Sequence, residues 1–230
     1  MNTKAILSQL CLATIIIVLF TGLLIQSLGP VIPVVSSSVP RQANQTTILS
    51  TGVNDGWILE STESSGTGGS INKNASTLRL GDDANDRQYL SILSFDASTL
   101  PGNAVITSVT LKFKYSGVFG DNPFDTFGNL LADIHKSGFS NNIALQPEDF
   151  KATASKNKVL TFTNTPIDNW YSQSLDPADF IYIKSNNIIQ FRLRFTNDDN
   201  DDKGADYLKI FSGDAGAANR PQLIIEYQVP

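Results

Sequence analysis

A run of five aspartates within nine residues is the chain's clearest candidate cation site. The run, DDNDDKGAD, extends from Asp198 to Asp206, and Gly204 permits a sharp turn within it. The oxygens of Asp198, Asn200 and Asp202 alternate as in the first half of a D-x-N-x-D calcium loop, and Asp206 is placed to close the site. The match is partial, because the glycine comes one residue late and no glutamate occupies position twelve. We predict calcium at these four residues, with a solvated acidic loop as the alternative.

A second acidic turn, GDDAND, occupies residues 81–86 and follows a short apolar alternation. Asp82 and Asp83 are secondary candidates for the same ion or for another one. A turn rich in Asp and Asn needs no ion, because these side chains hydrogen-bond to neighbouring backbone N–H groups. A simple turn is therefore the favoured interpretation of this segment.

Three aromatic residues are candidates for sugar binding: Trp57, Trp170 and Tyr171. Aromatic rings can stack on the CH faces of sugars. Asp168 and Asn169, just before Trp170, can hydrogen-bond to hydroxyl groups. The alternative is that these rings fill the hydrophobic core, as tryptophans in β-sandwiches commonly do.

The chain offers little for enzyme chemistry. His135 is the only histidine and shares a strand face with Asp133, which is typical of a structural histidine. The only cysteine, Cys11, lies near the N-terminus, and the sequence contains no G-x-S-x-G nucleophile elbow. The acidic residues cluster in turns, with no segment that suggests the cleft of a glycosidase. We therefore expect a non-catalytic protein.

The overall charge also restricts the partners. The sequence has 17 basic and 22 acidic residues, which gives a net charge of −5 at pH 7. It contains no lysine or arginine cluster of the kind that binds nucleic acid. An acidic chain of this composition is better suited to calcium or to neutral sugars.

Apolar residues recur with period two through most of the chain after residue 46. In the clearest run, 189–195, four apolar residues alternate with Gln190, Arg192 and Arg194. We interpret this polar row as a solvated face with ion pairs, with a ligand-binding sheet face as the alternative. Similar runs lie at 88–95, 105–115, 130–134, 159–162, 180–183, 207–211 and 223–227. The pattern predicts an all-β, jelly-roll-like antiparallel β-sandwich over residues 47–228.

The N-terminal segment has a different composition. Lys4 precedes an uncharged, largely apolar stretch, Ala5–Leu28, which predicts export through residues 1–38. This stretch is either a cleaved signal peptide or a membrane anchor helix, because it is also long enough to span a bilayer. Residues 39–46 read as a linker. The protein is therefore expected outside the cell or on its surface, in contact with the membrane only through residues 5–28 if these are retained.

Two motifs resemble a known family. The segment FDASTLP at 95–101 and the segment AVITSVTL at 104–111 are similar to the signature of DNRLRE-type extracellular domains, and RPQLIIEY at 220–227 is similar to their closing strand. Physically, the first motif describes a corner in which Asp96 and Ser98 bond backbone N–H groups and Leu100 packs beneath. The resemblance covers roughly residues 47–228. It implies a β-sandwich, grouped with a carbohydrate-binding-module family, that carries no catalytic motif.

Two functions follow as expectations. The first is a non-catalytic, calcium-stabilised module that binds polysaccharide or a cell-surface glycan. The second is a structural surface protein, such as an adhesin, surface-layer or pilus subunit, that assembles through its sandwich domain. The apolar segment at 31–35 favours the second to some extent, because an extended segment can add to the sheet edge of a neighbouring copy.

Overall fold

Twelve antiparallel strands form one hydrogen-bonded sheet in the computed structural model, which describes residues 43–183 and 187–230. The strands are β1 (Ala43–Leu49), β2 (Gly56–Glu60), β3 (Gly68–Asn72), β4 (Thr77–Asp82), β5 (Gln88–Asp96), β6 (Val105–Phe119), β7 (Leu130–His135), β8 (Lys156–Phe162), β9 (Trp170–Ser174), β10 (Ile188–Phe195), β11 (Tyr207–Phe211) and β12 (Gln222–Gln228). All-β architecture with antiparallel pairing, as the sequence predicted, is confirmed.

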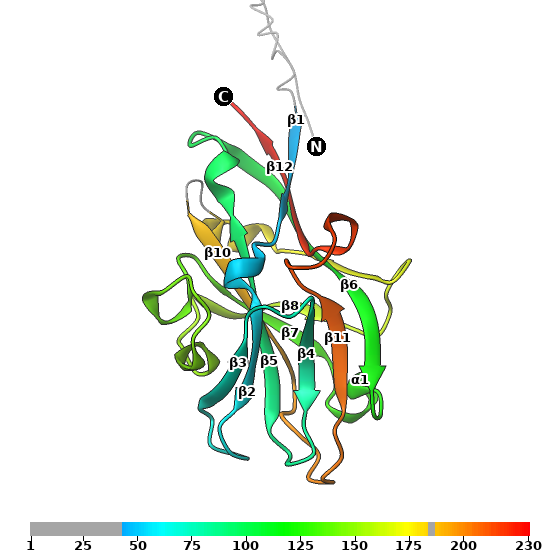
Figure 1. Cartoon of the computed structure of the whole chain (residues 1–230). Helices are drawn as coiled ribbons and strands as arrows, with labels where there is room; N and C mark the ends of the chain where they lie inside the picture. The colour runs from blue at the N-terminus through cyan, green and yellow to red at the C-terminus, as the bar shows by residue number, and fades with distance from the viewer. Residues whose placement is uncertain (1–42, 184–186) are drawn as a thin grey trace, which may run out of the picture. The chain divides into compact units, whose positions relative to one another are not determined.

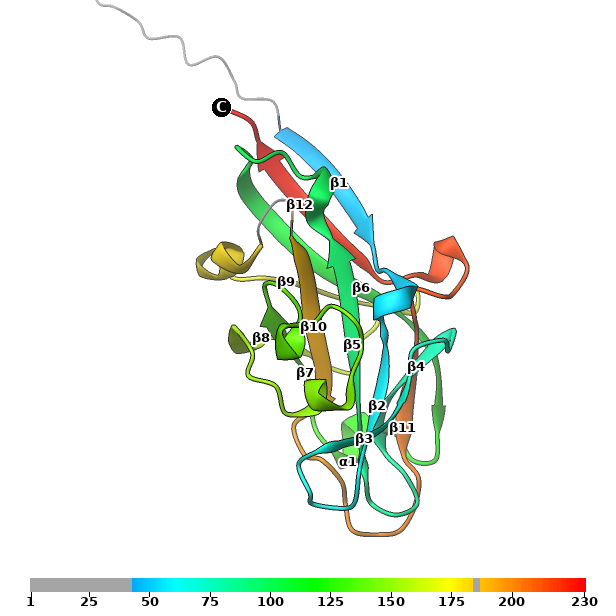
Figure 2. The same cartoon turned by 60° about the vertical axis from the view of Figure 1, so that its left-hand side comes forward.

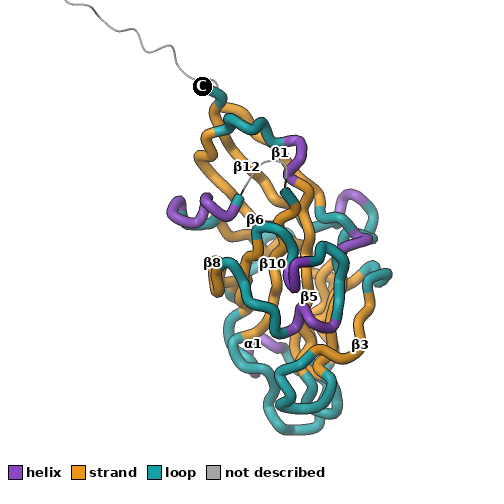
Figure 3. Tube along the Cα trace, turned by 90° about the vertical axis from the view of Figure 1, so that its left-hand side faces the viewer, coloured by secondary structure: helices purple, strands orange, loops and turns teal. Residues whose placement is uncertain are grey.

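Helix is confined to short turns in the connections, which Figure 3 shows around the strands. There is a single α-helical turn, α1 (Pro123–Thr126), in the described chain. The 3-10 turns are η1 (Gly52–Asn54), η2 (Ala97–Thr99), η3 (Phe139–Asn141), η4 (Pro147–Phe150), η5 (Pro177–Tyr182) and η6 (Ala217–Asn219). Within residues 43–183 and 187–230, none of these is long and apolar enough to cross a membrane.

The sheet curls into a half-barrel. Its path runs β1-β12-β6-β11-β4-β5-β10-β7-β8, while β2 joins β5, β3 joins β2, and β9 joins β6. Figure 1 shows β2, β5, β4 and β11 side by side, and Figure 2 shows β10 next to β5. The long strand β6 is central, because β12 and β11 pair with it in succession while β9 pairs with residues 110–114.

The main hydrophobic core lies inside this curl. Side chains of every strand except β2 and β3 enter it, mostly from alternate positions, which is the physical basis of the period-two pattern. Aromatic rings dominate the centre; Phe113 lies 4.7 Å from Phe162, and Phe95 lies 6.0 Å from Phe191, between ring centroids. All buried members of the core lie between Ile48 and Ile225, so the compact unit formed by residues 40–230 has a core of its own.

The domain boundary differs from the sequence prediction. β1 begins at Ala43, inside the segment 39–46 that was predicted to be a linker, and pairs with β12 along its whole length. The sequence pattern did not predict this strand, because β1 is rich in polar residues whose side chains face solvent. The predicted leader, residues 1–38, lies outside the described residues.

The corner at 95–101 is confirmed. Asp96 Oδ1 accepts a hydrogen bond of 2.9 Å from the backbone N–H of Ser98, which caps η2. Leu100 is buried below the turn. This part of the family-like motif therefore specifies the turn between β5 and β6.

The prediction of a solvated polar row is wrong for Gln190 and Arg192, which are buried, and Arg194 is half-buried; the expected ion pairs are present, because both arginines pair with Asp133. The β7–β8 connection, residues 136–155, covers this face of the sheet and builds a second small core. The apolar members of that core are Ile58, Leu90, Ile92, Phe139, Leu145 and Phe150. Arg192 is only 7% exposed beneath the connection. The alternation of apolar and polar residues within one strand does not show whether a loop from elsewhere in the chain covers the polar side. For this reason the sequence predicted these side chains to be solvated.

Arg192 is a central anchor of this cover. Its guanidinium donates to Asp133 Oδ2 at 2.9 and 3.2 Å, and to the backbone carbonyls of Asp149, Phe150 and Ala152. Arg194 also donates to Asp133 at 3.2 Å. Burial raises the pKa of Asp133, but hydrogen bonds from the Lys158 N–H and the two arginines outweigh it, and the pKa lies below its usual range.

Gln190 completes the attachment of the connection. Its side-chain carbonyl accepts from the Phe139 N–H, and its amide donates to the Ile143 carbonyl, both at 2.8 Å. The polar side chains of this buried strip thus join segments that are far apart in sequence. Removing one partner leaves an unpaired buried group, which is costly.

We predict that Arg192→Met destabilises residues 40–230 by about 3–5 kcal/mol, because the buried carboxylate of Asp133 loses one of its two arginines and three backbone carbonyls lose their donor. Urea unfolding measures the loss. Arg87→Gln, which breaks the more exposed Arg87–Asp83 ion pair, is the control and should cost less than about 1 kcal/mol. Similar losses in both variants would contradict the anchoring role of Arg192.

Candidate functional site

Trp170 lies on the face of β9 that points away from the core. A two-residue turn sets its position: Ile167 and Trp170 exchange backbone hydrogen bonds of 3.0 and 2.8 Å across Asp168 and Asn169. Asp168 and Asn169 have φ of 51° and 65°, the left-handed values that a type I′ turn requires and that Asp and Asn tolerate. The turn therefore fixes Trp170 at the start of β9.

Two ammonium groups lie over the Trp170 ring. Lys112 Nζ is 5.1 Å and Lys114 Nζ is 5.8 Å from the ring centroid, within the range of cation–π contacts. The ring also borders a pocket of about 310 Å³ together with Lys112, Thr165, Ile167, Asp168 and Ser172. Ile167 is 77% exposed at this pocket, so the site combines apolar, hydroxyl and charged groups at the surface.

Trp57 belongs to a second aromatic cluster built around Arg79. The Arg79 guanidinium carbon lies 5.2 Å from the Trp57 ring centre, 5.4 Å from Tyr89 and 5.0 Å from Tyr207. Arg79 also donates a 3.0 Å hydrogen bond to the Tyr89 hydroxyl. Phe119, 52% exposed, stacks on Tyr207 at 5.1 Å. The side chains come from β2, β4, β5, β11 and β6.

Cations of both clusters lie on the outer surface of the half-barrel. In β6, β11 and β4 the residues on either side of the cations enter the core, so the cations point to the opposite face. Lys209 of β11 lies directly opposite Arg79 of β4. We call this surface the basic–aromatic face; it consists of Trp57, Arg79, Lys112, Lys114, Phe119, Trp170, Tyr207 and Lys209.

The cations of this face have no acidic partners. Among the described residues, none of Arg79, Lys112, Lys114 and Lys209 takes part in an ion pair. Lys114 donates instead to Asn219 Oδ1 at 2.8 Å. Four unpaired cations on one face of a chain with a net charge of −5 make the local charge opposite to the overall charge.

The prediction of an exposed Tyr171 ring is wrong. Tyr171 is 3% exposed and packs between Phe113 and Phe124, each 5.5 Å away between ring centroids. It follows Trp170 directly in β9, so strand alternation turns it into the core. Burial raises the pKa of the Tyr171 hydroxyl to about 12.

The acidic loop at 198–206 joins β10 to β11, and its predicted ligands point to separate partners. Asp202 accepts hydrogen bonds from Asn200 Nδ2 at 2.7 Å and from the Gly204 N–H at 2.5 Å. Asp206 accepts from the Asp121 N–H at 2.5 Å, while Asp198 is exposed. The structure therefore does not bring Asp198, Asn200, Asp202 and Asp206 together around one point.

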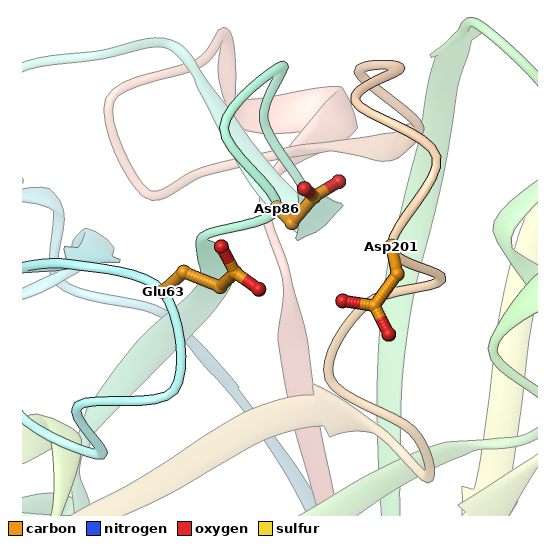
Figure 4. A group of neighbouring side chains, drawn as sticks. All are labelled: Glu63, Asp86 and Asp201. Atoms are coloured by element: carbon orange, nitrogen blue, oxygen red, sulfur yellow. The ribbon is translucent and has the colours of Figure 1, made fainter.

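A different acidic group forms at the same end of the domain. The β2–β3, β4–β5 and β10–β11 loops gather at the lower end in Figures 1 and 2. Glu63, Asp86 and Asp201 come one from each loop, as Figure 4 shows, with carboxylate oxygens within 4.8 Å of one another. None of these three residues is among the ligands predicted from the sequence, because only the tertiary fold brings the three loops together.

Lys203 already supplies a positive charge to this group. Its ammonium hydrogen-bonds to Asp86 Oδ2 and lies 4.0 Å from Glu63 Oε2, and its backbone N–H donates to Asp86 Oδ1 at 2.9 Å. The hydrogen bond from Lys203 lowers the pKa of Asp86. The acidic group is thus partly neutralised within the chain.

The two aspartates of the second acidic turn differ from each other. Asp83 is structural, since it accepts from the Asn85 and Arg87 N–H groups and pairs with the Arg87 guanidinium at 2.5 Å. Asp82 is fully buried, and its Oδ1 accepts from the Asp206 N–H at 2.9 Å. Its Oδ2 has no hydrogen-bond partner in the described chain. Burial, with the nearby charges of other aspartates, raises the pKa of Asp82 to about 7.

No protein-family model and no curated protein matches this chain, so the similarity to DNRLRE-type domains rests on the motif residues alone.

We predict that Asp82→Asn is more stable than the unaltered protein at pH 8 in the presence of chelator. The folded carboxyl keeps its proton up to about pH 7, whereas the unfolded one releases it near 3.8, so stability falls as the pH rises between these values. The neutral amide of the variant removes this loss, and the advantage should vanish near pH 4. Thermal melts across this range measure it.

Asp198→Asn is the matched control, because Asp198 is exposed in a neighbouring loop. It should leave the pH dependence unchanged. If the Asp82→Asn profile ran parallel to that of the unaltered protein, the buried carboxyl would not be the source.

Proposed function

We propose that this protein is a non-catalytic extracellular or cell-surface module that binds polysaccharide through the basic–aromatic face. The observation that carries the proposal is that both tryptophans of the chain border this one face, each next to an unpaired cation. Aromatic rings stack on the apolar CH groups of sugars, and lysine and arginine donate hydrogen bonds to sugar oxygens.

The charge of the face points to an acidic polysaccharide. Arg79 and Lys209 lie directly opposite each other on neighbouring strands, and like charges in such a pair repel. A carboxylate or sulfate group bound between them offsets this repulsion, and arginine binds carboxylates in a bidentate geometry. The net negative charge of the chain suggested a neutral sugar as the ligand. The positive charge of this face favours an acidic sugar instead.

The remaining residues support a role without catalysis. Asp133, the carboxylate nearest in sequence to His135, is committed to Arg192, Arg194 and the Lys158 N–H. It is therefore not available to orient the histidine as a general base, which is what an acid–base pair requires.

The proposal also includes a specific type of β-fold and a location of the protein outside the cell or on its surface. We base a jelly-roll-like sandwich of the DNRLRE type on the way in which most of the strands enclose the main core. Export through residues 1–38, followed by secretion or anchoring through residues 5–28, is supported by the composition of that segment.

A structural subunit is the second candidate. The strand path ends at β1, which therefore presents one edge of the sheet to a further strand among the described elements. Strand addition at such an edge is a common route to self-assembly. Size-exclusion chromatography separates the candidates, since a binding module stays monomeric and a subunit polymerises.

We predict that residues 40–230 are retarded by polygalacturonate in native affinity gels and much less by neutral dextran. Trp170→Ala should weaken binding roughly tenfold through the lost ring contact. Lys112→Gln with Lys209→Gln should weaken binding and flatten its salt dependence, because fewer charges take part.

Lys151→Gln is the matched control, because Lys151 is exposed in the β7–β8 connection and is not one of the residues of the face. It should bind as the unaltered protein does. Equal retardation by both polysaccharides, or binding that ignores all of these variants, would refute the assignment of the face.

We also propose that calcium stabilises the acidic end of the domain. The support is the convergence of Glu63, Asp86 and Asp201; in addition, Asp82, four residues before Asp86 in the sequence, has a buried oxygen without a hydrogen-bond partner in the described chain. Calcium accepts 6–8 oxygen ligands in irregular geometry, which suits loops of this kind. Lys203 competes for Asp86, so an ion there has to displace its ammonium.

We expect residues 40–230 to melt roughly 5–10 °C higher in calcium at a hundredfold excess over Kd than in chelator. Asp201→Asn should abolish the difference and Asp198→Asn should leave it intact, because only Asp201 belongs to the converging group. If Asp198→Asn abolished the difference and Asp201→Asn left it intact, calcium would bind instead at the site predicted from the sequence, which includes Asp198. A melting temperature that ignores calcium would mean that the loops are only solvated.

A further inference from the structure

A second pocket, of about 420 Å³, opens at the end of the half-barrel beside α1. Its apolar wall comes from Val118 of β6, Leu208 of β11 and the ring of Tyr171. The residues that follow β6 supply Asp121, and the β8–β9 connection supplies Asn164 and Asn169. The size falls within the range of small-molecule pockets, roughly 300–1,000 Å³.

Tyr171 presents a buried hydroxyl to this pocket. The side chain is almost fully buried, and its hydroxyl lies 3.4 Å from Asn164 Oδ1. Hydrogen bonds between oxygens are ordinarily about 2.5–3.0 Å long, so this donated bond is a long one, and the hydroxyl oxygen can also accept a hydrogen bond. Phe113 and Phe124 hold the ring in place, which leaves the hydroxyl fixed at the pocket wall. A hydroxyl group of a ligand can donate to the Tyr171 oxygen or replace Asn164 as the acceptor of its proton.

The polar residues of the pocket are also available. Asn169 has a left-handed backbone, and its carbonyl accepts a hydrogen bond of 2.8 Å from the Tyr115 N–H. The backbone is therefore held without use of the side-chain amide, which can bind a ligand. The backbone of Asp121 is fixed by its N–H bond to Asp206, while its carboxylate has no hydrogen bond or ion pair in the described chain. Amide and carboxylate groups of this kind bind adjacent hydroxyl groups.

We propose that this pocket binds one neutral pyranose residue. No lysine, arginine or histidine is among the described residues that line it, and the carboxylate of Asp121 repels an acidic sugar. The apolar wall takes the CH groups of a sugar ring, while Asp121, Asn164, Asn169 and the Tyr171 hydroxyl take its hydroxyl groups. The site is separate from the basic–aromatic face, and it rests on the proposed function only in that the ligand is a sugar.

The test uses residues 40–230 labelled with ¹⁵N, titrated with glucose, galactose, mannose and galacturonate. We expect saturable shifts of the Asn164 and Asn169 side-chain amide signals with at least one neutral sugar at millimolar concentration, and none with galacturonate. Tyr171→Phe keeps the packed ring and removes only the hydroxyl, so it should weaken this binding roughly tenfold while the rest of the spectrum is unchanged.

Trp170→Ala is the matched control, since Trp170 precedes Tyr171 but lines the other pocket. It should weaken binding of polygalacturonate and leave the monosaccharide shifts intact. Shifts of the two amides without polysaccharide binding would support the pocket and refute the basic–aromatic face. The absence of shifts with all three neutral sugars, or shifts that Tyr171→Phe leaves at full strength, would overturn the pocket proposal whatever the polysaccharide result.

Discussion

The backbone pairing of β6 is the constraint on which the rest of the molecule depends. β12, β11 and β9 all hydrogen-bond to this strand, so each of its side chains must face either the core or the opposite surface. Leu111 and Phe113 fill the core, while Lys112 and Lys114 stand on the other side beside Trp170. The ligand face and the core are therefore two sides of the same strand, and a shift of one residue in register would exchange them.

The two proposed sugar sites differ in charge because different groups line them. The basic–aromatic face uses cations that have no acidic partner within the described chain, whereas the pocket beside α1 uses amides, one carboxylate and the Tyr171 hydroxyl. The adjacent residues Trp170 and Tyr171 belong one to each site. An acidic polysaccharide with neutral residues can therefore meet both sets of groups.

Local sequence predicts what local geometry determines. Period-two alternation predicted the all-β fold, and the Asp96 corner was predicted correctly because its contacts lie within a few residues. Arg192 was placed in solvent because a connection about forty residues earlier covers it. For the same reason the cation site was predicted from the acidic loop alone. Glu63 and Asp86, which lie close to Asp201, come from turns that are distant in the sequence. Strand alternation alone would have separated Trp170 from Tyr171, and that signal was available.

Tryptophan fluorescence tests the central claim most directly, because the chain has only two tryptophans and both border the basic–aromatic face. Titration of residues 40–230 with oligogalacturonate should give a saturable change in emission at low salt that weakens as salt screens the lysines and Arg79. Binding detected by calorimetry with no change in tryptophan emission would place the ligand elsewhere and contradict this account.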